Sequence, residues 1–266
     1  MPSQLNPSAS GGVDRITRAI AQSAQRTGID FNYLMGQARI ESGLNPNAKA
    51  STSSATGLYQ FISQSWLAVV DQHGANHGMD WAAGAIQRDS RGRYQVADPE
   101  MRRAILDLRR NPEAAAAMAG EFAADNRDYL ERRLGREMAP VDLYLAHFLG
   151  AGGAHKFLAA HSANPDAAAA PLFGSAARAN RNVFYASNGR ARSLDEIRDR
   201  FAAKLGADAK VPAAGGKDRP GGNDLPFVQP ADYLRLASQR AKPSDIDLNN
   251  NDNARMAYML LASMGA

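Results

Sequence analysis

One carboxylic acid in this sequence stands where proton-transfer chemistry is expected. Glu41 ends a segment, 30–41, whose apolar side chains recur at helical spacing and whose first residue, Asp30, is a typical helix N-cap. At about 100 degrees per residue, Glu41 lies almost directly above Leu34 and near Ala38, on the stripe expected to face the core. Shielding from water favours the protonated form of a carboxyl group. Glu41 is therefore a candidate general acid.

A second interpretation of Glu41 stays open at this point. The glutamate also fits a solvated position at a fraying helix end, with Ser42 and Gly43 as the stop signal. Most glycosidases carry two carboxylates, one acid and one nucleophile or base. No second acidic residue follows Glu41 until Asp71, so a lone carboxylate requires the substrate to supply the nucleophile. Surface or capping positions are favoured for the four aspartates that remain candidates, which are Asp71, Asp80, Asp89 and Asp98.

A second short segment, 55–61, has residue types that suit a carbohydrate groove. Gly57 permits close approach between the backbone and a sugar, because it has no Cβ. Tyr59 offers an apolar ring face, and Gln60 can hydrogen-bond hydroxyl or acetamido groups. Leu58, between them, is expected to pack inward. The segment predicts a sugar-binding surface close to Glu41.

Three motifs in this order resemble those of the soluble lytic transglycosylase (SLT) family, relatives of goose-type lysozyme. They are Glu41-Ser42, Gly57-Leu58-Tyr59-Gln60 and Ala146-His147-Phe148-Leu149-Gly150. The resemblance covers residues 25–205 and implies a mainly α, lysozyme-like fold with a substrate cleft. It also implies non-hydrolytic cleavage of the MurNAc-β-1,4-GlcNAc bond of peptidoglycan, which leaves 1,6-anhydro-MurNAc ends.

The resemblance further implies roles for individual residues. In that family, the glutamate at the position of Glu41 protonates the glycosidic oxygen and then removes a proton from the C6 hydroxyl of the same muramic acid. No cofactor and no metal are implied. Substrate-binding roles are expected for Ser42, Ser51, Gly57, Leu58, Tyr59, Gln60, Tyr144, His147 and Tyr185.

The third motif departs from the family pattern at two positions. His147 stands where a tyrosine is usual, and Phe148 replaces an asparagine. A tyrosine there would orient the glutamate and support charge at the sugar C1, and a histidine can still donate a hydrogen bond. Tyr144, one helical turn earlier, is a joint candidate for presenting a hydroxyl. Phe148 is expected to fill the core.

Helical periodicity and capping signals predict a mainly α domain over 13–205, after a disordered stretch at 1–12. The predicted helices are 13–27, 30–42, 63–73, 99–110, 112–134, 140–150, 152–161 and 193–205. Segments 85–88 and 94–96 flank Ser90-Arg91-Gly92, which predicts one small β-hairpin. Residues 206–228, rich in Gly, Pro and Ala, are interpreted as a flexible linker, and 229–266 as a C-terminal helical appendage.

Composition excludes several classes of function. The net charge of +4 comes from basic residues scattered along helices without interleaved aromatics, so nucleic acid is not an expected partner. No apolar run approaches the length of about 18 residues that a membrane span requires. The chain has no cysteine, which excludes disulfides and thiolate metal sites. His73 and His77 are spaced like two metal ligands on one helix, but Gly74 and Gly78 weaken a helix there, and no metal is expected.

The implied activity places the protein in the periplasm or the cell wall. Residues 1–12 lack the pattern of a secretory signal, so removal of a leader, a specialised export route and release through a phage-made membrane lesion all stay open. We expect a monomer that acts on peptidoglycan glycan strands. The apolar run 256–261 makes 229–266 a candidate docking element for a protein partner.

Two alternatives to a lytic transglycosylase stay open from the sequence. The first is a hydrolytic muramidase or phage-type endolysin, which would use water in place of the sugar hydroxyl. The second is a catalytically silent wall-binding scaffold, which the departures at His147 and Phe148 favour and the intact Glu41 disfavours.

Overall fold

The computed structural model describes residues 7–51 and 53–207, and the side chains of 14–51 and 53–206. The longer helices are α1 (Pro7–Thr27), α2 (Phe31–Ser42), α3 (Ser63–His73), α5 (Pro99–Asp107), α6 (Pro112–Leu134), α7 (Pro140–Ala163) and α10 (Leu194–Ala207). Shorter helices are η1 (Gly74–His77), α4 (Asp80–Ala83), η2 (Leu108–Arg110), η3 (Ala170–Phe173), α8 (Gly174–Ala179) and α9 (Arg181–Phe184). Strands β1 (Gln87–Arg88) and β2 (Tyr94–Gln95) form a two-stranded antiparallel sheet.

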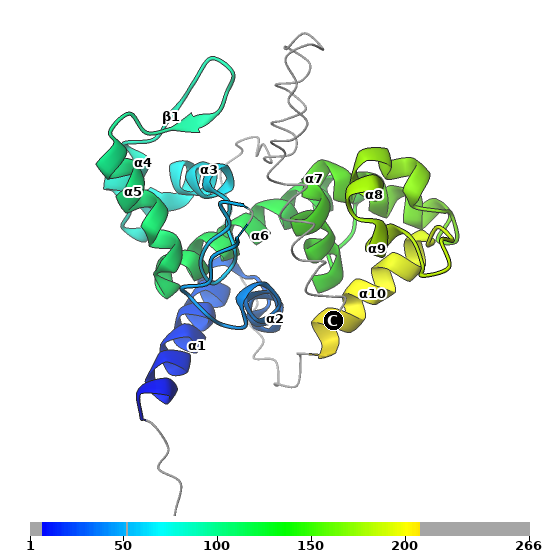
Figure 1. The fold of residues 1–266 in the computed structure, drawn as a ribbon, viewed down its shortest axis with the longest axis horizontal. Coiled ribbons are helices and arrows are strands. Elements are labelled where there is room, and N and C mark those ends of the chain that lie inside the picture. The colour runs from blue at the N-terminus through cyan, green and yellow to red at the C-terminus, as the bar shows by residue number, and fades with distance from the viewer. Residues whose placement is uncertain (1–6, 52, 208–266) are drawn as a thin grey trace, which may run out of the picture.

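The fold is mainly α, as predicted, and α6 is its central helix (Figure 1). On one side of α6 lie α1, α3, α4, α5 and the β-hairpin, and on the other lie α7 to α10. Helix α2 contacts α1, α6 and α10, so it touches both groups. The end of α2 is therefore the place where residues from the two halves of the domain can meet.

Most helix bounds agree with the sequence prediction, and two differences have local causes. Helices α3 and α6 cover the predicted residues, and the hairpin is confirmed with Gln87 opposite Gln95. Helix α1 begins at Pro7, so residues 7–12 are helical, whereas the sequence analysis predicted that they are disordered. A proline suits the first turn of a helix, where its missing N–H removes no hydrogen bond. The unpredicted helices η1, α4, η3, α8 and α9 have four to six residues, too few to show a helical period.

Helix α7 contains the break that the sequence predicted between 140–150 and 152–161. Gly150 has φ 75 and ψ 161, outside the helical region, although the ribbon continues on both sides of it. Gly150 is the last residue of the third motif, so the motif ends at the kink. Because of this kink, the two halves of α7 run in different directions, and the first half is the one that brings Tyr144 and His147 to α2.

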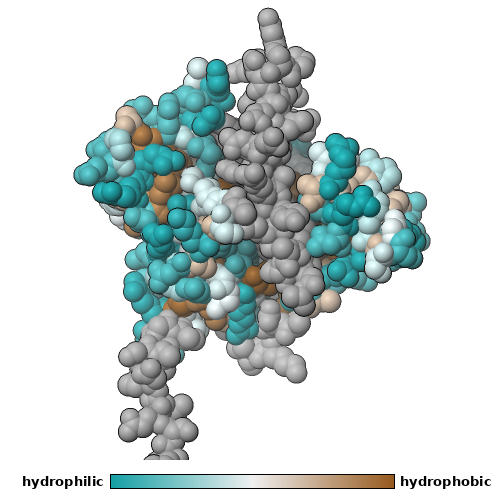
Figure 2. Space-filling model, in the orientation of Figure 1, coloured by the Kyte–Doolittle hydropathy of each residue, from teal (hydrophilic) through white to brown (hydrophobic). Residues whose placement is uncertain are grey.

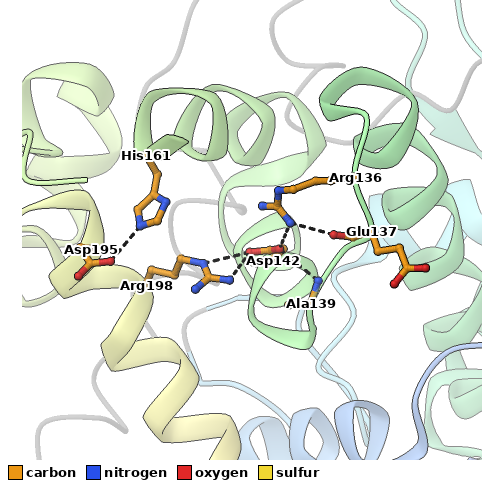
Figure 3. A network of polar contacts seen from close by, with 7 residues as sticks. All are labelled: Arg136, Glu137, Ala139, Asp142, His161, Asp195 and Arg198. Atoms are coloured by element: carbon orange, nitrogen blue, oxygen red, sulfur yellow. Dashed lines mark hydrogen bonds and ion pairs between the residues drawn. The ribbon is translucent and has the colours of Figure 1, made fainter. Parts of the chain in front are cut away.

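Helix α10 is attached to α7 by a buried ionic network (Figure 3). The fully buried Asp142 accepts hydrogen bonds from Arg136 at 2.7 Å, from Arg198 of α10 at 3.1 Å and from the backbone N–H of Ala139 at 3.1 Å. His161, to which the sequence assigned no partner, pairs with Asp195 at 3.0 Å near the start of α10. These contacts place α10 over the face of α7 that carries the third motif.

The aromatic residues between α10 and α7 complete this packing. Phe201 of α10 makes edge-on contacts with Tyr144 at 5.3 Å and with Phe148 at 5.2 Å between ring centroids. Phe148 thus packs against the core, as predicted. The outer surface seen in Figure 2 is mostly hydrophilic, with small apolar patches, and Trp81 is the exposed large apolar side chain of the described residues.

Candidate active site

Glu41 lies in the last turn of α2 with its carboxyl group shielded from water. The helix is fixed at one end by Asp30, whose side chain accepts a hydrogen bond from the Tyr33 N–H at 2.9 Å, and it ends at Gly43 in the left-handed conformation. The side chain of Glu41 is 2% exposed, and the remaining exposure of the residue is in its backbone. The predicted inward position of Glu41 is therefore confirmed, and the solvated alternative is excluded.

His147 of α7 is the direct partner of Glu41. Its Nε2 lies 3.0 Å from Glu41 Oε1, and its side chain is 8% exposed. The other ring nitrogen, Nδ1, lies 3.2 Å from Nε2 of Gln37, which is itself buried. The contact brings together the first and third motifs, about a hundred residues apart in the chain, into one site.

Two buried tyrosines also surround the carboxylate. Burial raises the pKa of Tyr33, and the negative charge of Glu41 raises it further. Burial likewise raises the pKa of Tyr144, with smaller contributions from Glu41 and Tyr33. The Tyr144 ring lies 6.0 Å from the His147 ring. Both phenols keep their protons at neutral pH, so they act here as neutral groups that can donate and accept hydrogen bonds.

The second motif is joined to the first by Ser42. Its hydroxyl lies 2.8 Å from the carbonyl oxygen of Leu58 and 3.1 Å from that of Ala38, one helical turn back. Ser42 therefore donates to the backbone and ties the end of α2 to the loop at 55–61. Leu58 is fully buried, as predicted.

The loop at 55–61 faces inward more than its sequence indicated. Tyr59 is 1% exposed and its hydroxyl has no hydrogen-bond partner among the described residues, so the predicted stacking of this ring on a sugar is wrong. Gln60 donates from Nε2 to the Gly57 carbonyl at 2.8 Å and to the Ala48 carbonyl at 3.2 Å. The amide nitrogen of Gln60 thus shapes the loop, and its φ of 50 is part of the same tight turn.

Gly57 is close to protein backbone and not to open space. It has φ +85, and a Cβ on it would lie 1.8 Å from the carbonyl oxygen of Arg109. Arg109 in turn donates to the carbonyls of Ser54 at 2.7 Å and Phe61 at 3.0 Å, and burial lowers the pKa of its guanidinium to about 10, which leaves it charged at neutral pH. Gly57 was expected to allow a close approach of a sugar, but it allows a close approach of η2 instead. Arg109 of η2 is hydrogen-bonded to the backbone at both ends of the loop.

Two predicted substrate-binding residues have no described contact with the Glu41 site. Ser51 is exposed, next to the undescribed residue 52. Tyr185 is half-buried, with the Arg181 guanidinium 4.8 Å from its ring centroid and a backbone bridge to Ala191. Their roles in substrate binding remain predictions.

The other acidic and histidine candidates have local structural partners. Asp89 accepts from two N–H groups of the hairpin turn, Asp98 caps α5, and burial raises the pKa of Asp71. His73 lies 2.7 Å from Asp125, and His77 lies 2.9 Å from Glu121, both on α6. Within 7–51 and 53–207, no group of three or more such side chains has the arrangement of a metal site.

Sequence reasoning missed two members of the site, Gln37 and Tyr33. Gln37 precedes Glu41 by one helical turn and Tyr33 by two, so both share the face of α2 that carries the carboxylate. The helical spacing was visible in the sequence. What was not visible is that α7 would bring an imidazole against that face.

The arrangement suits proton transfer by one carboxyl group. Oε1 of Glu41 is hydrogen-bonded to His147, and the negative charge of Glu41 raises the pKa of the two buried phenols nearby. A shielded carboxyl group with a hydrogen-bond donor on one oxygen can give a proton to a substrate and take one back.

A comparison with known families supports this chemistry. The family described as the Transglycosylase SLT domain matches residues 18–80, which include the first two motifs and exclude the third. The match confirms the resemblance to the soluble lytic transglycosylases and their lysozyme-like fold, and it implies peptidoglycan lytic transglycosylase activity in general terms. Proteins with this domain act on peptidoglycan outside the cytoplasm. No helix in the described part of the chain combines the length and the apolar character needed to cross a membrane.

Proposed function

We propose that this protein cleaves the MurNAc-β-1,4-GlcNAc bond of peptidoglycan without water, with Glu41 as acid and then as base. The single observation that carries the proposal is the shielded Glu41 carboxyl group, 2% exposed and bonded through Oε1 to His147. This geometry holds one carboxyl group in place and leaves its second oxygen for the glycosidic oxygen.

The proposed reaction has two proton transfers. Protonated Glu41 gives its proton to the bridging oxygen as the bond to the muramic acid C1 breaks, and the N-acetylglucosamine side leaves as an alcohol. The resulting carboxylate then takes the proton of the C6 hydroxyl of the same muramic acid, whose oxygen bonds to C1 and closes the 1,6-anhydro ring. Glu41 is protonated again at the end, and no water is consumed.

The contact of the Glu41 carboxyl group with an imidazole, and not with a second carboxylate of the described residues, favours this route over hydrolysis. A two-carboxylate glycosidase needs a nucleophile or a base for water within several ångströms of the acid. In the described residues, the polar contact found for the Glu41 carboxyl group is with His147 and not with a second acid. Asp71 is the next acidic residue after Glu41 in the sequence, and its pKa is raised by burial and lowered by Arg88 of the hairpin.

The test is digestion of purified sacculi followed by mass spectrometry of the products. The wild-type protein should release muropeptides with 1,6-anhydro ends, and Glu41→Gln should release none. Asp71→Asn is the control, because it also replaces a carboxylate by its amide but at an exposed position on α3, and it should keep the wild-type products. Reducing ends in place of anhydro ends would identify a hydrolytic muramidase or endolysin. Wild type and Glu41→Gln that bind sacculi equally without turnover would identify a wall-binding scaffold.

The remaining assignments follow from this activity as proposals. The working location is the periplasm or cell wall, and the catalytic unit is the region 13–205 acting as a monomer. The linker at 206–228 and the appendage at 229–266, with its suggested protein partner, lie outside the described residues except for 206 and 207, which continue α10. A substrate role is retained as a proposal for Ser42, Ser51, Tyr144, His147 and Tyr185.

A further inference from the structure

We propose that Gln37 is a positioning residue that fixes the tautomer of His147 and thereby decides which oxygen of Glu41 carries the catalytic proton. The proposal rests on the function proposed above, but its structural part concerns the resting protein and can be measured without turnover. It assigns a role to a buried glutamine that lies outside the three sequence motifs.

The geometry places one imidazole between two side chains of a single helix turn. Gln37 and Glu41 are four residues apart on α2, and His147 reaches them from α7. Gln37 Nε2 lies 3.2 Å from His147 Nδ1, and His147 Nε2 lies 3.0 Å from Glu41 Oε1. Because all three side chains are shielded from water, these contacts set the protonation pattern.

The amide of Gln37 selects one form of the neutral ring. Its Nε2 has only hydrogens to offer, so His147 Nδ1 must present a lone pair. In a neutral imidazole the other nitrogen then carries the hydrogen, and His147 Nε2–H donates to Glu41 Oε1.

This tautomer is the one compatible with both protonation states of Glu41. When Glu41 is ionised, the Nε2–H bond stabilises the carboxylate at Oε1. When Glu41 is protonated, the same bond still needs Oε1 as acceptor, so the proton is confined to Oε2, which is left for the substrate. In the opposite tautomer, the Nε2 lone pair would attract the proton to Oε1 and turn it away from the glycosidic oxygen.

The neighbours of the imidazole leave this selection to Gln37. Tyr33 of α2 and Tyr144 of α7 both have a raised pKa and stay neutral, and among the described residues the hydrogen-bond partner of His147 Nδ1 is Gln37. Phe201, from α10, covers Tyr144 with an apolar ring. Glu41 is the acidic group that the imidazole contacts through a described hydrogen bond, and that contact is made at Nε2.

Two variants of Gln37 separate the tautomer from mere packing. Gln37→Met keeps the length of the side chain and removes the donor to Nδ1. Gln37→Glu replaces the donor by an acceptor, which calls for a hydrogen on Nδ1. Gln64→Met is the matched control: Gln64 also uses its whole amide, with contacts of 2.7 and 3.0 Å to the Tyr94 backbone, but on the hairpin side of the domain.

The experiment uses the full chain with ¹⁵N-labelled histidine, and nitrogen NMR reports which ring nitrogen of His147 is protonated. The wild type should show the Nε2–H form, Gln37→Met a shift toward Nδ1–H, and Gln37→Glu protonation of Nδ1. On sacculi, Gln37→Met should lose roughly ten- to a hundredfold in kcat with little change in KM, a range expected when one partner of a buried hydrogen bond is removed. Gln64→Met should keep the wild-type spectrum and kcat.

Each other outcome overturns part of the proposal. A wild-type Nδ1–H form refutes the tautomer assignment. A Gln37→Met protein with the wild-type spectrum and a reduced kcat shows that Gln37 serves only packing. A changed spectrum with an unchanged kcat shows that the tautomer does not matter for turnover. If the wild type itself releases no product, the proposed function fails, while the nitrogen spectra still decide the tautomer.

Discussion

Replacing Gly57 by alanine should be among the most damaging small changes in this domain. Gly57 has φ +85, and an ideal Cβ there would lie 1.8 Å from the carbonyl oxygen of Arg109 and 2.6 Å from its carbonyl carbon. Both atoms belong to the backbone of η2, so they cannot move aside as the end of a flexible side chain would. The substitution must displace the loop at 55–61, the segment η2, or both.

The size of the effect follows from two separate costs. A non-glycine residue in the left-handed region costs about 1–2 kcal/mol. Forcing an extra carbon into a packed position costs about 1–3 kcal/mol more. The total of about 2–5 kcal/mol is a large share of the 5–15 kcal/mol that typically stabilises a domain. At about 2–4 °C per kcal/mol for a domain of this size, the melting temperature should fall by roughly 4–20 °C.

Gly135 provides the control that isolates the contact with Arg109. It has φ +65 at the end of α6, and a Cβ there would meet nothing within 4 Å. Gly135→Ala therefore carries the cost of the backbone conformation alone, about 1–2 kcal/mol. Calorimetry and urea unfolding of both variants give the difference. Equal destabilisation by the two substitutions would refute the close approach of Gly57 to η2.

Gly57→Ala should also reduce turnover on sacculi in the molecules that remain folded. The Leu58 carbonyl accepts the hydroxyl of Ser42, so a shifted loop withdraws an acceptor from the turn that carries Glu41. Gly135→Ala should leave turnover at the wild-type level, because the end of α6 has no described contact with that turn.

Three further substitutions probe other parts of the structure. Asp142→Ala removes a fully buried carboxylate from its two arginine partners and should lower the free energy of unfolding in urea by about 3 kcal/mol. This value is near the lower limit for a broken buried pair, because both arginines keep some contact with water. A destabilisation smaller than that from breaking an exposed ion pair would contradict the network of Figure 3. Burial raises the pKa of Asp125, although its hydrogen bond with His73 opposes the shift. At pH values just above the ordinary carboxyl pKa, the folded state therefore binds more protons than the unfolded state. Wild-type stability accordingly falls as pH rises through this range. Asp125→Asn should accordingly gain stability relative to wild type as pH is raised from about 4 to 7, and a relative loss would reverse the sign of this reasoning. His147→Phe removes the hydrogen bond to the Glu41 carboxyl group, and a hydrogen bond to a charged group is worth about 1.5–3 kcal/mol. The variant should lose about ten- to a hundredfold in kcat while sacculus binding persists. An unchanged kcat would exclude His147 from proton transfer.

The sequence predicted well those elements whose signals are local. Helix α6 begins after Asn111, whose side chain caps it, has Pro112 in its first turn and ends at a left-handed Gly135, and its predicted bounds match. The inward position of Glu41 was one of two interpretations that its helical spacing to Leu34 and its place at the helix end allowed, and the structure distinguishes them. Such features depend on residues within one or two helical turns, and these residues can be identified directly from the sequence.

The second motif was misjudged because its environment comes from a distant segment. Gly57, Tyr59 and Gln60 have residue types that suit a sugar, yet η2 lies against the loop and Arg109 bonds the carbonyls at both ends of it. No sequence signal near Gly57 predicts its contact with Arg109. Residue type indicated that the loop was special, but only the packing of η2 could distinguish a substrate contact from a structural one.

The departure at His147 has a structural counterpart elsewhere in the site. A tyrosine has one hydroxyl and needs no second partner to fix its hydrogen, whereas a neutral imidazole has two forms and donates from only one nitrogen at a time. A histidine at this position therefore requires a group behind it, and Gln37 lies there, one turn before Glu41 on the same helix. The substitution and its support are best understood as one unit, because a chain with His147 and without a donor at residue 37 would leave the orientation of the catalytic proton undetermined.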